Sequence, residues 1–187
     1  AAPGGKTTQL ACLTSNKAHI TACEMNTIRL DRLKYNIEKQ GAKCVSIMKK
    51  DSRQLDDFFA FDNILLDAPC SGSGTLDFND SNAHKYFTEK LIQKSCFSQK
   101  ALLKKAINVL KKGQEMVYST CSILEEENSE QITKFLSTNK EFSLIDMQTI
   151  WDKKIESPYP FVDNNCLKFN PLTTGTDGFF IAVLERN

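Results

Sequence analysis

Short continuous apolar runs alternate along the chain with longer segments in which apolar residues recur at helical spacing. The short runs predict strands over residues 18–23, 43–48, 61–67, 115–120, 142–146 and 178–186. The longer segments predict helices over residues 26–41, from about 91 to 111 with an end at Gly113, and from Leu124 to about Ser137. Strands that alternate with helices are typical of a mostly parallel sheet with helices on both faces. The pattern therefore predicts an α/β fold with a doubly wound sheet.

The chain opens on a glycine-rich loop, AAPGGKT. Its last residues, Gly5-Lys6-Thr7, match the second half of a P-loop, which also requires a glycine one position before Ala1 and a Mg²⁺-binding aspartate after an apolar strand. Asp67 follows such a strand, in NILLD. A nucleotide triphosphatase is therefore one hypothesis. If the loop instead follows the first strand of the sheet, that strand precedes Ala1, and we expect a chain truncated at its N-terminus.

The residues that end the predicted strands are acids and cysteines. In open α/β sheets, ligands bind outside the carboxyl ends of the strands, where this chain carries Glu24, Asp51, Asp67, Cys70 and Cys121. A cysteine in such a place is more often a small buried residue than a nucleophile. Two cysteines, each followed by serine at the same edge, favour a chemical role instead. Hydrolysis by a P-loop enzyme uses neither thiol.

Composition narrows the class of protein. With 187 residues, 41% of them hydrophobic, the chain suits one domain over residues 1–187. Its seven cysteines include no C-x-x-C pair and no cluster with histidine, which predicts a reduced intracellular protein without a metal. No apolar run is long enough to span a membrane, so no membrane association is expected. The net charge of +1 predicts that other sequence contributes much of any nucleic-acid affinity.

Several strings together resemble the Sun-domain family of RNA 5-methylcytosine methyltransferases, which use S-adenosylmethionine. They are AAPGGKT, ACEMN, KKDSR, DAPCSGSGT, YSTCSI with the following EEEN, and TDGFFIAVLER. The resemblance covers nearly the whole chain, and the paired Pro-Cys and Thr-Cys strings separate this family from other methyltransferases. It implies a Rossmann-like methyltransferase fold with an antiparallel C-terminal strand. It also implies an RNA partner, with ribosomal RNA favoured over transfer RNA.

The resemblance implies roles for four residues in catalysis. Carbon 5 of cytosine is a weak nucleophile, and a thiolate that adds to carbon 6 activates it. Cys121 matches the family's nucleophile, and Cys70 matches the cysteine that assists product release. Asp67 matches the aspartate that bonds the polar edge of cytosine. Lys6 is expected near the same centre, where it would bind the target or lower the pKa of a thiol.

The resemblance also implies a set of cofactor-binding residues. Glu24 is expected to accept both ribose hydroxyls, Asp51 to meet the adenine amino group, and Ser52 to lie beside the ring. The residues expected to hold the rest of the cofactor are Ala2, Pro3, Gly4, Gly5, Lys6 and Asp67. The alternatives are a helix N-terminal acid for Glu24 and a solvated loop acid for Asp51.

Some features are interpreted as structural, and two alternatives to catalysis stay open. Arg29 matches a recurrent family arginine, but an exposed helix charge explains it as well. The lysines at 104, 105, 111 and 112 are interpreted as an exposed face, with phosphate contact as the alternative, and Glu125 to Glu127 as a helix cap and solvated face. The segment LDFNDSNAHKYFTEK departs from the family's basic stretch after SGSGT, which leaves the target RNA open. A monomer is expected, in the cytoplasm, or in the nucleolus if the source is eukaryotic. A non-catalytic RNA-binding scaffold and the nucleotide triphosphatase remain as alternatives.

Overall fold

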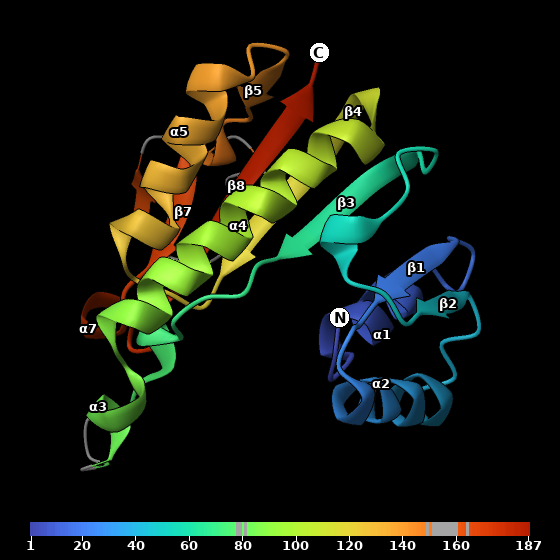
Figure 1. The fold of residues 1–187 in the computed structure, drawn as a ribbon, viewed down its shortest axis with the longest axis horizontal. Helices are drawn as coiled ribbons and strands as arrows, with labels where there is room; N and C mark the ends of the chain where they lie inside the picture. The colour runs from blue at the N-terminus through green and yellow to red at the C-terminus, as the bar shows by residue number, and fades with distance from the viewer. Residues whose placement is uncertain (78–79, 81, 149, 151–160, 164) are drawn as a thin grey trace. The chain divides into compact units, whose positions relative to one another are not determined.

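The computed structural model describes residues 1–77, 80, 82–148, 150, 161–163 and 165–187. The chain divides into two compact units, residues 1–56 and 57–187, and each is described by itself (Figure 1). Trp151 and part of the segment that follows SGSGT lie outside the described residues. Within the described part of the chain, no helix has the length and apolar character needed to cross a membrane.

The first unit consists of a parallel strand pair and two helices. Its elements are α1 (Gly5–Leu13), β1 (Ile20–Cys23), α2 (Thr27–Lys39), β2 (Val45–Met48) and the 3-10 turn η1 (Ser52–Gln54). Strands β1 and β2 pair in parallel from Ile20 opposite Val45 to Cys23 opposite Met48. Ala2, Ala22 and Leu33 form the buried core of this unit. The predicted strands and the predicted helix are confirmed here, each slightly shorter than expected.

Helix α1 was not predicted, because the glycine-rich string was interpreted only as a loop. The helix begins at Gly5, directly after Gly4, whose φ of 110° lies in the left-handed region. A Cβ atom at Gly4 would lie 2.9 Å from Cδ1 of Leu33 on α2. Glycine at position 4 therefore satisfies both the backbone turn and the close packing of α1 against α2.

The second unit is a six-stranded sheet with helices. Its elements are β3 (Phe61–Asp67), η2 (Ser73–Thr75), α3 (Ala83–Tyr86), α4 (Glu89–Val109), β4 (Leu110–Thr120), η3 (Glu125–Glu127), α5 (Ser129–Thr138), β5 (Phe142–Leu144), β6 (Phe161–Asp163), β7 (Cys166–Phe169), α7 (Pro171–Thr174) and β8 (Phe179–Arg186). Strand β3 pairs with β4 in parallel, and β8 runs antiparallel to β4, β5 and β7. Strands β3, β4, β5 and β7 thus share one direction, and β8 opposes them. The α/β class and the antiparallel C-terminal strand are confirmed.

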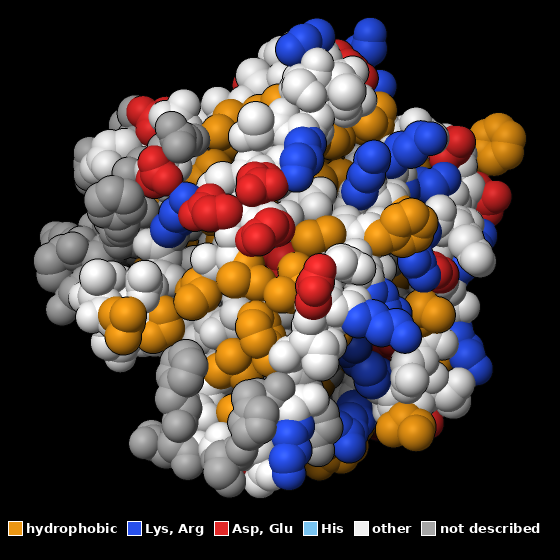
Figure 2. All heavy atoms as spheres, turned by 60° about the vertical axis from the view of Figure 1, so that its left-hand side comes forward, with side chains coloured by type: hydrophobic (Ala, Val, Ile, Leu, Met, Phe, Trp, Pro, Cys, Tyr) orange, Lys and Arg blue, Asp and Glu red, His pale blue; other side chains and the backbone are white. Residues whose placement is uncertain are grey.

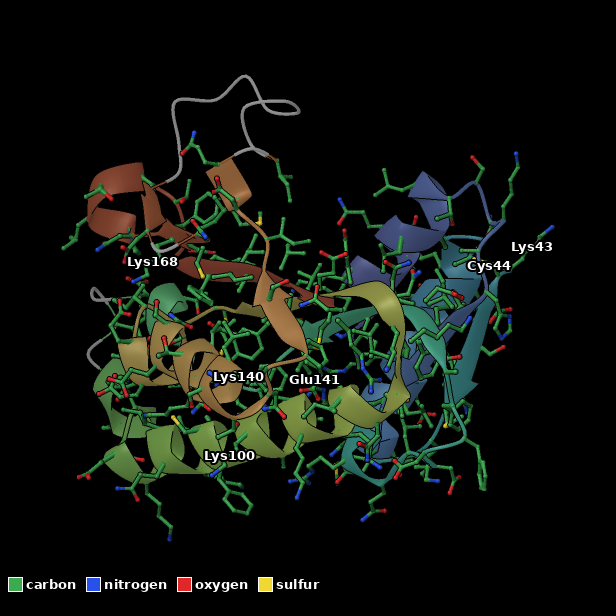
Figure 3. The ribbon with its side chains drawn as sticks, turned by 90° about the horizontal axis from the view of Figure 1, so that it is seen from above. Lys43, Cys44, Lys100, Lys140, Glu141 and Lys168 are labelled. Atoms are coloured by element: carbon green, nitrogen blue, oxygen red, sulfur yellow. The ribbon has the colours of Figure 1, made fainter. Side chains whose placement is uncertain are left out.

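The sheet of the second unit packs its two faces into separate apolar clusters. Helices α4 and α5 lie on one side of it (Figure 3), where Tyr118 and Phe180 of the sheet meet Leu103 of α4 and Phe135 of α5. The alternate residues of β4 and β8, among them Val117 and Val183, face a second cluster around Met147 and Leu167. Full burial of side chains of this size contributes about 1.5–3 kcal/mol each relative to exposure.

Two predictions about this unit need correction. Helix α4 was expected to continue to about residue 111, but it ends at Val109, and Leu110 already pairs with Phe61 as the first residue of β4. Gly113 lies inside the strand with a φ of 69°. Strands β6 and β7 were not predicted, because the proline-containing segment around them has no regular alternation.

Two glycines let the loops at one end of this sheet touch through their backbones. Gly178 donates from its N–H to the carbonyl of Gly74 at 2.7 Å, and Gly74 donates to the carbonyl of Cys121 at 3.0 Å. A Cβ atom on Gly74 would lie 2.4 Å from the carbonyl oxygen of Gly178. Backbone atoms cannot yield as a flexible side chain does, so alanine does not fit there without a shift of the loops.

We expect Gly74→Ala to lower the free energy of unfolding by about 1–3 kcal/mol, the usual cost of overpacking a tight site. Urea unfolding measures this change in the free energy of unfolding. Leu172→Ala is the matched control, because this side chain is 92% exposed and its loss should change stability by less than about 0.5 kcal/mol. Equal stability of the two variants would contradict the close backbone packing.

Candidate active site

The carboxyl ends of β3 and β4 place two cysteine-bearing loops side by side. Asp67 at the end of β3 pairs with Ser119 of β4. The ladder continues one residue further, where the N–H of Ala68 donates to the carbonyl of Ser119 at 2.8 Å. Cys70 follows β3 by three residues and Cys121 follows β4 directly, so both thiols emerge at the same edge of the sheet.

The two thiols are in contact. The Sγ atoms of Cys70 and Cys121 lie 3.2 Å apart, and both side chains are half-buried. The hydrogen bond with Cys121, followed by burial, raises the pKa of the Cys70 thiol far above its ordinary value. Cys70 therefore keeps its proton and can donate a hydrogen bond to the sulfur of Cys121.

Asp67 lies at the same sheet edge as the thiols. The Ser119 hydroxyl donates to its Oδ1 at 3.1 Å, and the aspartate side chain is exposed. A carboxylate held from one side by a serine can accept further hydrogen bonds from a ligand on its solvent side. The sequence identified the aspartate but not Ser119, whose position opposite Asp67 follows only from the register.

A buried network of small polar side chains holds the two loops together. The hydroxyls of Ser73 and Ser122 share a hydrogen bond of 2.8 Å, and the N–H of Ile123 donates to Ser73 Oγ at 3.0 Å. Asn128 accepts from the Thr120 hydroxyl at 2.5 Å and donates to the carbonyl of Ser122 at 2.8 Å. Because the buried polar atoms satisfy one another, the loops need no apolar core of their own.

Glu127 corrects the interpretation of the glutamate run as a helix cap and solvated face. Glu125 and Glu126 are exposed, but Glu127 is fully buried and accepts hydrogen bonds from Ser71. The run shows no periodic signal that separates its third member from the first two. Sequence reasoning missed this residue for that reason.

In the first unit, Glu24 is the centre of a second group of hydrogen-bonded residues. It directly follows β1 and is only 7% exposed. Its Oε1 accepts from the N–H of Asn26 at 3.0 Å, and its Oε2 accepts from the N–H of Ala2 at 3.3 Å. Burial alone would raise the pKa of Glu24, but these hydrogen bonds and nearby positive charge outweigh it, and the pKa lies below the ordinary value. The carboxylate stays ionised and is joined to the glycine loop.

Side chains of α2 hold the glycine loop from the other direction. Arg29 donates from its guanidinium to the carbonyl of Ala2 at 2.6 Å, and its Nε lies 3.7 Å from Oε2 of Glu24. Asn36 donates to the carbonyl of Pro3 at 2.8 Å. The interpretation of Arg29 as a plain exposed charge is therefore incomplete, because more than half of this side chain is exposed while its tip orders the loop.

Asp51 lies after β2, at the same edge of the parallel pair as Glu24. It caps η1, and its carboxylate accepts from the Arg53 guanidinium, with the shortest contact 2.6 Å. These hydrogen bonds from Arg53 lower the pKa of Asp51. Ser52 follows Asp51 as the first residue of η1. Arg53 already occupies the carboxylate that was expected to meet adenine, so a ligand there would share Asp51 with Arg53.

The predicted residues thus fall into two sets. The first unit brings together Ala2, Pro3, Gly4 and Glu24, with Asp51 and Ser52 at the neighbouring strand end. The second unit brings together Asp67, Cys70 and Cys121. Lys6 lies exposed in the first turn of α1, in the first unit, and its proximity to the thiols stays a prediction.

Charge is mixed on the face that Figure 2 pictures. Figure 2 shows lysine and arginine side chains interleaved with acidic and apolar ones on the pictured face. Two of the lysines considered for phosphate contact are paired with carboxylates, Lys105 with Asp57 at 2.7 Å and Lys111 with Asp62 at 2.6 Å. Among the described residues, no group of three or more histidine, cysteine, aspartate or glutamate side chains is arranged to hold a metal ion.

Comparison with known proteins finds one family whose model spans both groups of residues. A family model described as 16S rRNA methyltransferase RsmB/F matches residues 1–185. The chain is 32% identical over 188 residues to ribosomal RNA small subunit methyltransferase F of Vibrio campbellii, which covers 100% of this chain and 39% of the relative. The chain therefore spans about two fifths of the length of the curated relatives it matches.

Two solved structures from Pyrococcus horikoshii have the same fold over the whole chain. The structure of NSun6 with SFG is 34% identical, with a TM-score of 0.83, and the match covers 46% of that protein. A methyltransferase homolog is 33% identical, with a TM-score of 0.80, and the match covers 59% of it. Both matches cover 100% of this chain.

The lowered pKa of Glu24 predicts a loss of stability in acid. A carboxyl whose pKa is lower in the folded state stabilises the fold above its ordinary value of 4.5. That contribution disappears as the pH falls through the lower folded value. We expect Glu24→Gln to destabilise the first unit by about 1–3 kcal/mol at neutral pH and to remove this part of the acid sensitivity. Hydrogen exchange of the β1 amides at several pH values measures both effects.

Glu38→Gln is the matched control for this experiment, because Glu38 is an exposed glutamate of α2. It should retain the protection of β1 and its acid sensitivity. Identical acid profiles for wild type and Glu24→Gln would contradict the assigned role of the carboxylate.

The contact between the thiols predicts ready oxidation. Hydrogen peroxide should convert one thiol to a sulfenic acid, which the other thiol attacks, so that water leaves and a Cys70–Cys121 disulfide forms. Intact mass spectrometry should show the loss of two hydrogen atoms, reversed by dithiothreitol, and peptide mapping should identify the pair. Cys70→Ala should not form this link. Peroxide-treated wild type in which both thiols still react with iodoacetamide would contradict the prediction.

Proposed function

Because the chain belongs to the 16S rRNA methyltransferase RsmB/F family, we propose that it forms the S-adenosylmethionine-dependent catalytic core of an enzyme that methylates carbon 5 of cytosine in ribosomal RNA. The observation that carries the chemical part of this proposal is the pair of thiols 3.2 Å apart at the ends of β3 and β4. An oxygen or nitrogen acceptor in a substrate attacks the methyl group with its own lone pair. A methyltransferase that acts on such an atom therefore needs no thiol. Methylation at carbon 5 of a pyrimidine does need a thiol, because a thiolate that adds to carbon 6 activates carbon 5.

Cys121 is the proposed nucleophile. Its thiolate adds to carbon 6 of the cytosine, a sulfur–carbon bond forms, and the electrons of the ring double bond move to carbon 5. Asp67 at the same sheet edge would accept a hydrogen bond from the polar edge of the base and orient it. S-adenosylmethionine, when bound, would supply an electrophilic methyl group to carbon 5, and its sulfonium–methyl bond would break to leave S-adenosylhomocysteine.

Cys70 is the proposed residue for release. After methylation, a water molecule accepts the proton from carbon 5, the ring double bond re-forms, and the bond between carbon 6 and sulfur breaks. The departing sulfur of Cys121 carries the electron pair of that bond. Cys70 lies 3.2 Å away, and its raised pKa keeps a proton available to stabilise this sulfur.

The cofactor residues in the first unit fit an adenosine-containing ligand. Glu24 is an ionised carboxylate at a strand end, the type of group that accepts ribose hydroxyls in related folds. Gly5 is exposed, and a Cβ atom there would meet nothing within 4 Å, so the loop backbone is open to the approach of a ligand at this residue. Asp51 stands at the neighbouring strand end and offers a second acceptor. These features support S-adenosylmethionine with eight proposed contacts in the first unit, Ala2, Pro3, Gly4, Gly5, Lys6, Glu24, Asp51 and Ser52. Asp67 of the second unit stays a predicted contact.

No specific observation favours either of the two alternatives, the nucleotide triphosphatase and the non-catalytic RNA-binding scaffold. The nucleotide triphosphatase hypothesis has no use for the thiol pair, and the matching family is one of methyltransferases. A scaffold without activity would not require Cys70 and Cys121 to remain in contact. The methyltransferase is therefore the function that we propose.

Replacement of each thiol should give opposite results in the full-length protein. Cys121→Ala should reduce methylation more than about a thousandfold, as the loss of a nucleophile does elsewhere, and should form no covalent RNA adduct. Cys70→Ala should form the adduct through Cys121 and retain it, because release is slowed. Denaturing gel electrophoresis with labelled RNA separates the adduct from free protein.

Cys44→Ala is the control, since this half-buried cysteine of the first unit (Figure 3) is not one of the thiol pair. It should behave as wild type. An adduct that persists in Cys121→Ala and disappears in Cys70→Ala would reverse the two assignments.

A further inference from the structure

Glu127 is buried beside two exposed glutamates. Its exposure is 0%, whereas the side chain of Glu125 is 54% exposed and pairs with Lys168 at 2.7 Å. Lys168, labelled in Figure 3, also contacts Asp163 at 2.8 Å. Burying a carboxylate is costly unless hydrogen bonds replace its hydration. The position of Glu127 therefore calls for specific partners.

Those partners belong to the residue after Cys70. The N–H of Ser71 donates to Oε1 of Glu127 at 2.8 Å, and its hydroxyl donates to Oε2 at 2.6 Å. Both carboxylate oxygens are thus used on one residue, through charge-assisted hydrogen bonds. The carbonyl of Glu127 in turn accepts from the Tyr118 hydroxyl at 2.6 Å. Glu127 therefore joins the Cys70 loop to the segment that carries Cys121.

Pro69, the residue before Cys70, is also held by a buried side chain. Gln99 of α4 has an exposure of 0% and donates from its amide to the carbonyl of Pro69 at 2.9 Å. Cys70 thus lies between two residues that buried side chains hold. Cys121 follows β4 without an intervening residue, and a buried side chain other than Glu127, that of Asn128, holds the residues on either side of it.

We propose that Glu127 is a positioning residue that holds Cys70 against Cys121 for the release step, acting through Ser71. This inference rests on the proposed function. Only a carboxylate of this length accepts both Ser71 donors, and glutamine at this position would turn an N–H₂ group towards one of them. Loss of these hydrogen bonds moves Cys70, while Cys121 keeps its position directly after β4. Adduct formation then persists and adduct resolution slows.

The test uses the full-length protein, ribosomal RNA and S-adenosylmethionine. Glu127→Gln should slow the resolution of the adduct by roughly ten- to a hundredfold, the range for a misplaced reacting group, with adduct formation changed far less. The adduct should therefore accumulate during turnover. Glu126→Gln is the control, because it makes the same chemical change one residue away on an exposed side chain, and it should match wild type.

A double variant separates positioning from a general structural role. In a Cys70→Ala background, Glu127→Gln should slow resolution no further, because its effect passes through the missing thiol. Additive slowing, or equal slowing of adduct formation and resolution in the single variant, would overturn the inference. If Glu127→Gln fails to fold, Ser71→Ala removes the hydroxyl donor to Glu127 and retains the backbone donor. It also removes a long hydrogen bond of 3.4 Å from the N–H of Ser73, and it should show the same accumulation to a smaller degree. A wild-type protein that forms no adduct and no 5-methylcytidine would instead refute the proposed function itself, and the inference with it.

Discussion

The parallel pairing of β3 with β4 determines where both thiols lie. Asp67 stands opposite Ser119, so the chain leaves both strands at the same edge, and Cys70 meets Cys121 at 3.2 Å. The pairing is itself maintained by the core, since Met116 and Tyr118 of β4 are fully buried under α4 and α5. A shift of one residue in this register would turn these side chains to the opposite face and separate the thiols. Fold stability and site geometry thus depend on the same contacts.

The composition of the two loops follows from how closely they approach. Gly74 and Gly178 touch through backbone atoms, which only residues without a Cβ allow. Around them, Ser73, Ser122 and Asn128 satisfy one another in a buried network. Small polar residues are short enough to form hydrogen bonds between adjacent backbones, and they leave no donor exposed to an apolar core. The string DAPCSGSGT therefore serves packing as well as the proposed chemistry.

Local patterns in the sequence predicted much of the fold and only part of the site. The strand over residues 61–67 agrees with β3 to the residue, because its apolar run is bounded clearly on both sides. The strand-end rule identified Glu24, Asp67 and the two cysteines. It could not identify Glu127, Ser119 or the contact of Arg29 with Ala2, because burial and register are set by residues distant in sequence. Helix α1 was missed because its glycines indicate a loop more strongly than a helix start.

The central claim is that the thiol pair serves methylation at carbon 5 of cytosine. The most direct test incubates the full-length protein with S-adenosylmethionine carrying a labelled methyl group and with ribosomal RNA, digests the RNA to nucleosides, and identifies the labelled product by mass spectrometry. The account predicts label in 5-methylcytidine. Label in any other nucleoside, or unlabelled RNA from a protein that binds the cofactor, would contradict it.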